Sequence, residues 1–124
     1  MAVNPRGSDL KQLLAEETDP PSPCVMLNLL KFKEGGRASY EEYVSKFPPF
    51  AERYGASVIY VGDCSTPLAV PDAGFDWDVL LVVQYPNRQA FTDMVADPEY
   101  QQITGLRTAA LDAAVLQATI PWAA

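Results

Sequence analysis

The chain has 124 residues, of which 48% are apolar and 20% are charged, a composition typical of one globular domain. Its net charge of −7 argues against binding to nucleic acid or to a membrane surface, and its longest apolar run, residues 79–83, is too short to cross a bilayer. The absence of histidine excludes a serine–histidine or cysteine–histidine nucleophile pair and argues against zinc and histidine-bound haem, so we expect neither a metal nor a cofactor.

Residues 1–23 are predicted to be an N-terminal helical appendage followed by a proline-rich connector. Ser8 could cap a short helix whose apolar face carries Leu10, Leu13 and Leu14. The stretch TDPPSPC then favours an extended chain. With no apolar signal segment near the start and only Cys24 and Cys64 as thiols, a cytoplasmic location is expected.

Residues 24–32, CVMLNLLKF, are predicted to form the first strand of a domain that spans residues 24–124. After the turn KEGGR, Ser39 is the expected cap of a helix with an aromatic stripe at spacings of three and four. Pro48-Pro49 should kink or split that helix near Phe47, and Gly55 should end it. The aromatic stripe comprises Tyr40, Tyr43, Phe47, Phe50 and Tyr54.

The second half of the domain repeats the pattern of strand and helix. Strands are expected at residues 56–64, 77–85 and 114–120. Between the last two, one helix begins at Asn87 and a second begins at Asp97-Pro98 and runs to about Ala113. The order βαββαβ predicts an α+β, ferredoxin-like fold with a four-stranded antiparallel sheet and its helices on one face.

The two central strands are apolar on both faces, although helices can cover only one. The other face needs a cover, and a second copy of the chain is the expected one, so we predict a homodimer. The N-terminal helix is the alternative cover.

Three stretches, VMLNLLKFK, FDWDVLLVVQYP and NRQAFTDMVADPEY followed by Arg107, resemble a bacterial family known as domain of unknown function 1330 (DUF1330). The resemblance covers about residues 24–120. That family belongs to the dimeric α/β-barrel superfamily, so the resemblance implies this arrangement but no established activity. Other members of the superfamily include cofactor-independent monooxygenases, haem-degrading monooxygenases and muconolactone-type isomerases. Pro48-Pro49 departs from the regular first helix of that family.

Asn28 is the candidate centre of a functional site. It shares a strand face with Met26 and Leu30, and if that face lies under the helices, its amide meets Tyr40, Tyr43 and Phe47. An amide among aromatic rings is typical of a small-molecule pocket. Alternatively, the amide only satisfies a neighbouring polar group, and the aromatic stripe is only core.

Two further residues are candidates for ligand contact. Trp77 could face the same cavity as Asn28, as in some monooxygenase relatives, or could simply pack at a strand end. Arg107, two helical turns after Tyr100, could hold an anionic group or could form a surface ion pair with Asp112 or Glu99.

The sequence therefore supports two hypotheses. In the first, the protein binds or transforms a small aromatic or enolisable molecule without a cofactor, in the manner of a monooxygenase or isomerase. Asn28 orients a carbonyl, Tyr40 transfers a proton, and Tyr43, Phe47, Trp77 and Arg107 contact the ligand. In the second, the protein is a non-catalytic ligand-binding or stress-related dimer.

Overall fold

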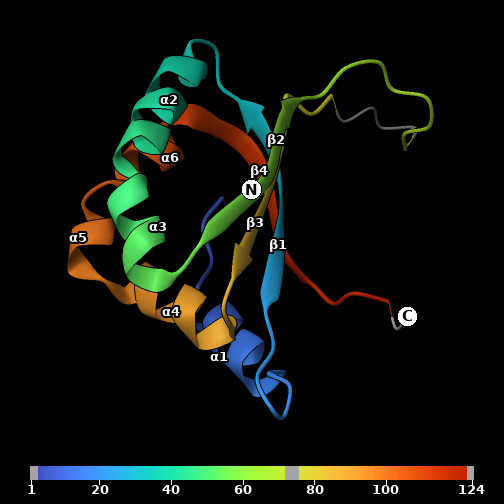
Figure 1. Cartoon of the computed structure of the whole chain (residues 1–124). Helices are drawn as coiled ribbons and strands as arrows, with labels where there is room; N and C mark the ends of the chain where they lie inside the picture. Colours follow the sequence, from blue (N-terminus) through green and yellow to red (C-terminus); the bar gives the residue numbers. More distant parts are fainter. Residues whose placement is uncertain (1–2, 72–75, 123–124) are drawn as a thin grey trace.

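The computed structural model describes residues 3–71 and 76–122, and Figure 1 shows the helices α2 to α6 gathered on one side of a sheet. None of the helices within these residues is long and apolar enough to cross a membrane. The elements in chain order are α1 (Gly7–Ala15), β1 (Cys24–Phe32), α2 (Gly36–Lys46), α3 (Pro48–Tyr54), β2 (Ser57–Asp63), β3 (Val79–Tyr85), α4 (Arg88–Ala96), α5 (Pro98–Gln101), α6 (Thr104–Ala110) and β4 (Leu111–Thr119).

The four strands form one sheet in the order β2-β3-β1-β4, and every neighbouring pair is antiparallel. This order is the one that a βαββαβ chain adopts in the ferredoxin-like fold, so the predicted α+β architecture is confirmed. Strand β1 lies at the centre, where Asn28 pairs with Leu81 of β3 on one side and with Leu116 of β4 on the other. The backbone around Asn28 is therefore fully engaged in the sheet.

The two faces of β1 differ in burial, as its alternating side chains require. Cys24, Met26, Asn28 and Leu30 point toward the helices and are buried, whereas the residues between them are partly exposed. Asn28 therefore lies on the helix-covered face of the sheet. We call this face the inner face of the sheet and the opposite one the outer face.

The aromatic helix is split where Pro48-Pro49 predicted it. Helix α2 ends at Lys46, and α3 begins with Pro48 as its first residue, because a proline needs no amide hydrogen at that position. Gly55 ends α3 in the left-handed conformation, with φ of 72°.

The start of α2 differs from the prediction. Ser39 is not its cap, because the helix already begins at Gly36, after Gly35 with a φ of 74°. The Ser39 hydroxyl instead donates a hydrogen bond of 2.7 Å to the carbonyl of Leu106, which joins α2 to α6. The two helices approach so closely that a Cβ on Gly36 would lie 2.2 Å from the carbonyl oxygen of Ala110.

The second helical region contains three pieces rather than two. Asn87 caps α4 and Asp97 caps α5 through their side-chain oxygens, as predicted. The helix expected to reach Ala113 breaks after Gln101, resumes as α6 and ends at Ala110. Strand β4 starts directly at Leu111, three residues before the predicted strand.

The N-terminal segment packs against the helical layer. Helix α1 lies beside α4 (Figure 1), and its Leu10 and Leu13 contact the core. The Arg88 guanidinium donates to the carbonyl of Leu13, and the Arg88 amide donates to the carboxylate of Glu17. This placement leaves the outer face of the sheet uncovered by α1.

Candidate functional site

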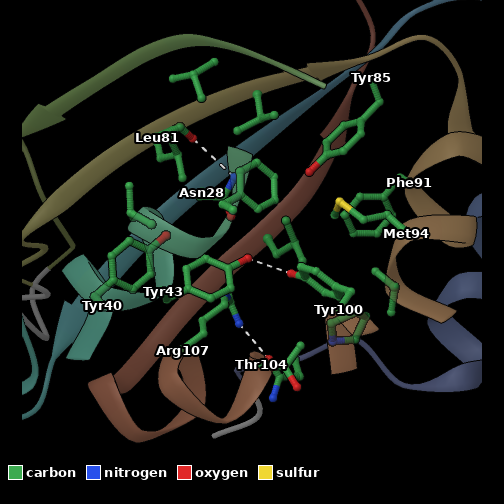
Figure 2. Close-up of a pocket in the computed structure, with 18 of the residues that line it drawn as sticks. Asn28, Tyr40, Tyr43, Leu81, Tyr85, Phe91, Met94, Tyr100, Thr104 and Arg107 are labelled. Atoms are coloured by element: carbon green, nitrogen blue, oxygen red, sulfur yellow. Dashed lines mark hydrogen bonds between the residues drawn. The ribbon is translucent and has the colours of Figure 1, made fainter. Parts of the chain in front are cut away.

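A cavity of about 240 Å³ lies between the inner face of the sheet and the helices. Figure 2 shows the side chains of β1, β3, α2, α4 and α6 that converge on it. Its lining is mostly aliphatic and aromatic, and its polar groups are three side-chain amides, four phenols, one threonine hydroxyl and one guanidinium. The residues that line it are Asn4, Pro5, Asn28, Tyr40, Tyr43, Val44, Phe47, Val58, Val61, Leu81, Val83, Tyr85, Phe91, Met94, Val95, Tyr100, Gln101, Thr104, Arg107 and Leu116.

Asn28 stands on the floor of this cavity with 8% of its surface exposed. Its side-chain nitrogen donates to the carbonyl of Leu81 over 3.4 Å, a long hydrogen bond, and this is its one side-chain hydrogen bond within the described residues (Figure 2). With only this long hydrogen bond among the described residues, the side-chain amide of Asn28 keeps donor and acceptor capacity for a molecule in the cavity.

A pair of tyrosines crosses the cavity from opposite elements. The hydroxyls of Tyr43 on α2 and Tyr100 on α5 are 2.6 Å apart (Figure 2). One hydroxyl donates to the other, so one hydrogen of the pair remains to be donated elsewhere. Tyr40 stacks at a tilt beside Tyr43, with ring centroids 5.5 Å apart.

Burial sets the protonation state of the phenols. It raises the pKa of Tyr40 to about 12, and it raises the pKa of Tyr43, Tyr85 and Tyr100 in the same direction. The nearby positive charge of Arg107 lowers each of these pKa values, but by less than burial raises them. All four phenols are therefore neutral hydrogen-bond donors at neutral pH, not bases.

Arg107 is buried, with 6% of its surface exposed, and it lines the cavity from α6. Its Nη1 donates to the backbone carbonyl of Val3 and, over 2.8 Å, to the side-chain oxygen of Asn4. Its Nη2 is buried without a hydrogen-bond partner among the described residues. The alternative of a surface ion pair is therefore wrong: Asp112 is exposed on β4, and the ion pair of Glu99 is with Arg53.

The candidate residues separate into two groups. The structure brings Asn28, Tyr40, Tyr43, Phe47 and Arg107 together around the cavity. Trp77 is not among the lining residues; it precedes β3 and is partly exposed.

The aromatic stripe also divides at the proline break. Its first three members, up to Phe47, line the cavity, whereas Phe50 and Tyr54 do not. Phe50 packs edge-on against Tyr100 with centroids 5.5 Å apart, and the Tyr54 hydroxyl donates to Asp97 over 2.6 Å. These two residues hold α3 against α4 and α5.

Several lining residues escaped the sequence reasoning. Tyr85 follows Leu81 and Val83 on the inner face of β3, so strand alternation could have pointed to it. Asn4 carried no signal, because its role depends on how residues 3–6 lie against α6.

Within residues 3–71 and 76–122, no group of three His, Cys, Asp or Glu side chains is placed to hold a metal ion. Asp78, which directly follows Trp77, accepts a hydrogen bond from the Phe32 amide and lies 3.7 Å from the Lys31 amine. These contacts of Asp78 stabilise the end of the sheet, where β1 finishes.

Solved structures with the same fold include a close match in overall shape. The RPA0582 protein of unknown function from Rhodopseudomonas palustris is 26% identical, with a TM-score of 0.86 over 98% of each chain. A putative antibiotic biosynthesis monooxygenase from Bacteriodes thetaiotaomicron is 14% identical, with a TM-score of 0.56 over 81% of this chain and 90% of that one. A dimeric protein of unknown function and ferredoxin-like fold from Bacteroides fragilis is 12% identical, with a TM-score of 0.52 over 78% and 94%.

No curated protein is significantly similar to this chain. The family model of a domain of unknown function, DUF1330, matches residues 29–119, a span that includes β2, β3, β4 and the helices α2 to α6. The chain belongs to the DUF1330 family.

Proposed function

We propose that the cavity binds a small aromatic or enolisable carbonyl compound, of about one substituted ring. The observation that carries this proposal is the underused Asn28 amide, buried in a cavity walled by aromatic rings. The volume supports the size: an apolar cavity of about 150 Å³ accepts benzene, and this one measures about 240 Å³.

Each cavity residue has a role in this proposal that follows from its chemistry. The side-chain nitrogen of Asn28 and the neutral hydroxyl of Tyr40 donate hydrogen bonds to the ligand's carbonyl oxygen. The same donors would stabilise that oxygen as it gains negative charge in an enolate. Tyr43 and Phe47 supply a ring surface, with their own centroids 6.0 Å apart.

The lining limits what chemistry the protein itself supplies. The described lining residues include phenols of raised pKa and a guanidinium, but no carboxylate to act as a base. An enolate would therefore form only if the bound molecule is acidic enough to lose its proton to solvent water, and the proposed chemistry is cofactor-independent. The same observation favours the second candidate function, binding without turnover.

We further propose that the protein is a homodimer in which two outer faces meet. That face carries Leu27, Leu29, Leu80, Val82 and Val115, and the neighbouring strand β2 adds Tyr60, which pairs with Val82 and is 55% exposed. Helix α1, the alternative cover, lies beside α4 on the helical side instead. The Bacteroides fragilis protein of the same fold is described as dimeric.

The free thiols of Cys24 and Cys64 support a reducing, cytoplasmic location.

Binding can be tested with the isosteric variant Asn28→Leu. Wild-type protein is titrated, by calorimetry, with hydroxylated benzaldehydes, acetophenones and cyclic 1,3-diketones. We expect one or more to bind once per chain, and Asn28→Leu to weaken that binding at least about tenfold while the protein stays folded, because one hydrogen bond to the carbonyl is lost. Lys46→Leu, an equally polar-to-apolar change on the exposed side of α2, is the control.

The opposite result would be a wild-type protein that binds none of these compounds, together with an Asn28→Leu variant that loses several kcal/mol of stability. Asn28 would then be a structural residue of the sheet.

A further inference from the structure

Arg107 is a buried cation without an anion. Its side chain is as buried as the core tyrosines, and within the described residues it forms no ion pair. Buried charges in proteins are normally paired, because an unpaired charge is poorly solvated in the interior. In addition, Nη2 has no hydrogen-bond partner in the described part of the chain. The guanidinium therefore lacks what an anionic ligand would provide.

Two neutral oxygens from one short segment accept hydrogen bonds from the Arg107 guanidinium. Both the Val3 carbonyl and the Asn4 side chain accept from Nη1. This segment, residues 3–6, precedes α1 and contains no helix or strand, and we call it the N-terminal arm. Asn4 is exposed to solvent and is tied to α6 by one further bond of 2.7 Å to Thr108.

The N-terminal arm is a thin partition. Asn4 and Pro5 line the cavity on one side and a second hollow on the other, where Leu10, Leu13 and Met26 form part of the wall. Because space lies on both sides, Asn4 and Pro5 have room to shift. The two oxygens of the arm could then leave the guanidinium, and a ligand oxygen could take their place.

We propose that Arg107 is an anion subsite of the cavity, which takes the carboxylate of a small aromatic carboxylic acid in exchange for the oxygens of the N-terminal arm. The carboxylate would accept from Nη1 and Nη2 together, the paired geometry that arginine favours. The inference rests on the proposed function, since the ring of the ligand fills the cavity described above, and it names the ligand's class.

The electrostatics of the cavity favour this ligand. The whole chain carries a net charge of −7 and repels anions in general, so the charge of Arg107, which lines the cavity, favours an anion at this place. The influence of Arg107 on the pKa of Tyr40, Tyr43, Tyr85 and Tyr100 shows that its charge is felt throughout the cavity. The spare hydrogen of the Tyr43–Tyr100 pair is a further donor for an anionic oxygen.

The test compares two ring compounds of nearly equal size, the anion 4-hydroxybenzoate and its neutral carboxamide 4-hydroxybenzamide, by calorimetry on the full chain. Wild-type protein is expected to bind the benzoate at least tenfold more tightly. Arg107→Gln should remove this preference, and Arg107→Lys should retain part of it. Arg88→Gln is the matched control, because Arg88 is equally buried, at 6% exposed, but does not line the cavity.

The exchange itself predicts a second effect. Asn4→Ala removes a competing oxygen from Arg107, so benzoate affinity should rise severalfold while amide affinity stays the same. A fall in benzoate affinity would contradict the exchange.

The outcomes separate this inference from the proposed function. Equal binding of benzoate and benzamide by wild-type protein overturns the anion subsite but keeps the cavity as a binding site. Failure of both compounds, and of the neutral carbonyl compounds above, overturns both. The comparison in wild-type protein decides the matter even if Arg107→Gln does not fold.

Discussion

The two faces of the sheet come from the same strands but have different chemistry. The inner face carries Asn28 on β1 and Tyr85 on β3, next to the phenols of the helices, whereas β1 and β3 present only aliphatic side chains and Gln84 at the matching outer positions 25–29 and 80–84. Hydrogen-bond donors at fixed places suit a small ligand, and a broad aliphatic surface suits another protein surface. The comparison indicates that one alternating pattern can serve two kinds of recognition.

The largest effect is expected from a charge on the outer face. Val82→Asp would place an unpaired carboxylate between two apolar sheets, so the dimer dissociation constant should rise about 1000-fold or more. Sedimentation velocity at micromolar concentration measures it. Val44→Asp, at an exposed valine of α2, is the control and should leave the dimer intact. A Val82→Asp protein that still sediments as the wild type would break the comparison.

The next effect concerns the packed part of the inner face. Leu30 is completely buried between β1 and the helices. Leu30→Ala should lower the free energy of unfolding by about 2–5 kcal/mol, because it removes buried methyl groups and leaves a void. Urea denaturation at fixed protein concentration measures this loss, and a change below about 1 kcal/mol would mean that the inner face is looser than described.

The buried phenols predict alkaline instability. Because the folded pKa of Tyr40 is raised to about 12, above an unfolded value of about 10, its stabilising contribution is complete below pH 10 and is lost as the pH rises toward 12. Stability should therefore fall over that interval, with Tyr43, Tyr85 and Tyr100 adding in the same direction. Denaturation at a series of pH values, with phenolate absorbance recorded, tests this. Tyr40→Phe should make the fall shallower, and an unchanged slope would contradict the assignment.

The smallest effect comes from one hydrogen bond across the cavity. Tyr100→Phe removes the 2.6 Å contact with the Tyr43 hydroxyl but keeps the ring. It should cost about 1 kcal/mol of stability. Gln101→Ala, at the next position, offers a comparison, because its side chain only donates to the Val95 carbonyl at the surface. Equal losses would show that the buried hydroxyl pair has no special role in stability.

Most of the fold could be predicted because its signals are local. The alternation in residues 24–32, the caps at Asn87 and Asp97, and the break at Pro48 each depend on a few neighbouring residues. The cap at Ser39 failed because a tertiary contact with Leu106 uses its hydroxyl instead.

The site was only partly predictable, since it is assembled from distant segments. Asn28, Tyr40 and Tyr43 belong to two consecutive elements, so their meeting follows from the βα unit. The partner of Tyr43, Tyr100, is 57 positions away, and the acceptors of Arg107 lie more than 100 positions away. No periodicity of the chain reveals contacts of that kind. These long-range contacts also determine whether Arg107 lies at the surface or in the interior.

We propose above that the inner face encloses a binding site for a small ring compound. Native mass spectrometry of the wild-type protein, equilibrated with the carbonyl and carboxylate compounds above, tests it most directly. We expect a dimer that carries up to two small molecules, with occupancy reduced at least about tenfold in Asn28→Leu because a hydrogen bond to the ligand is lost. A protein that retains none of these compounds at millimolar concentration would contradict it.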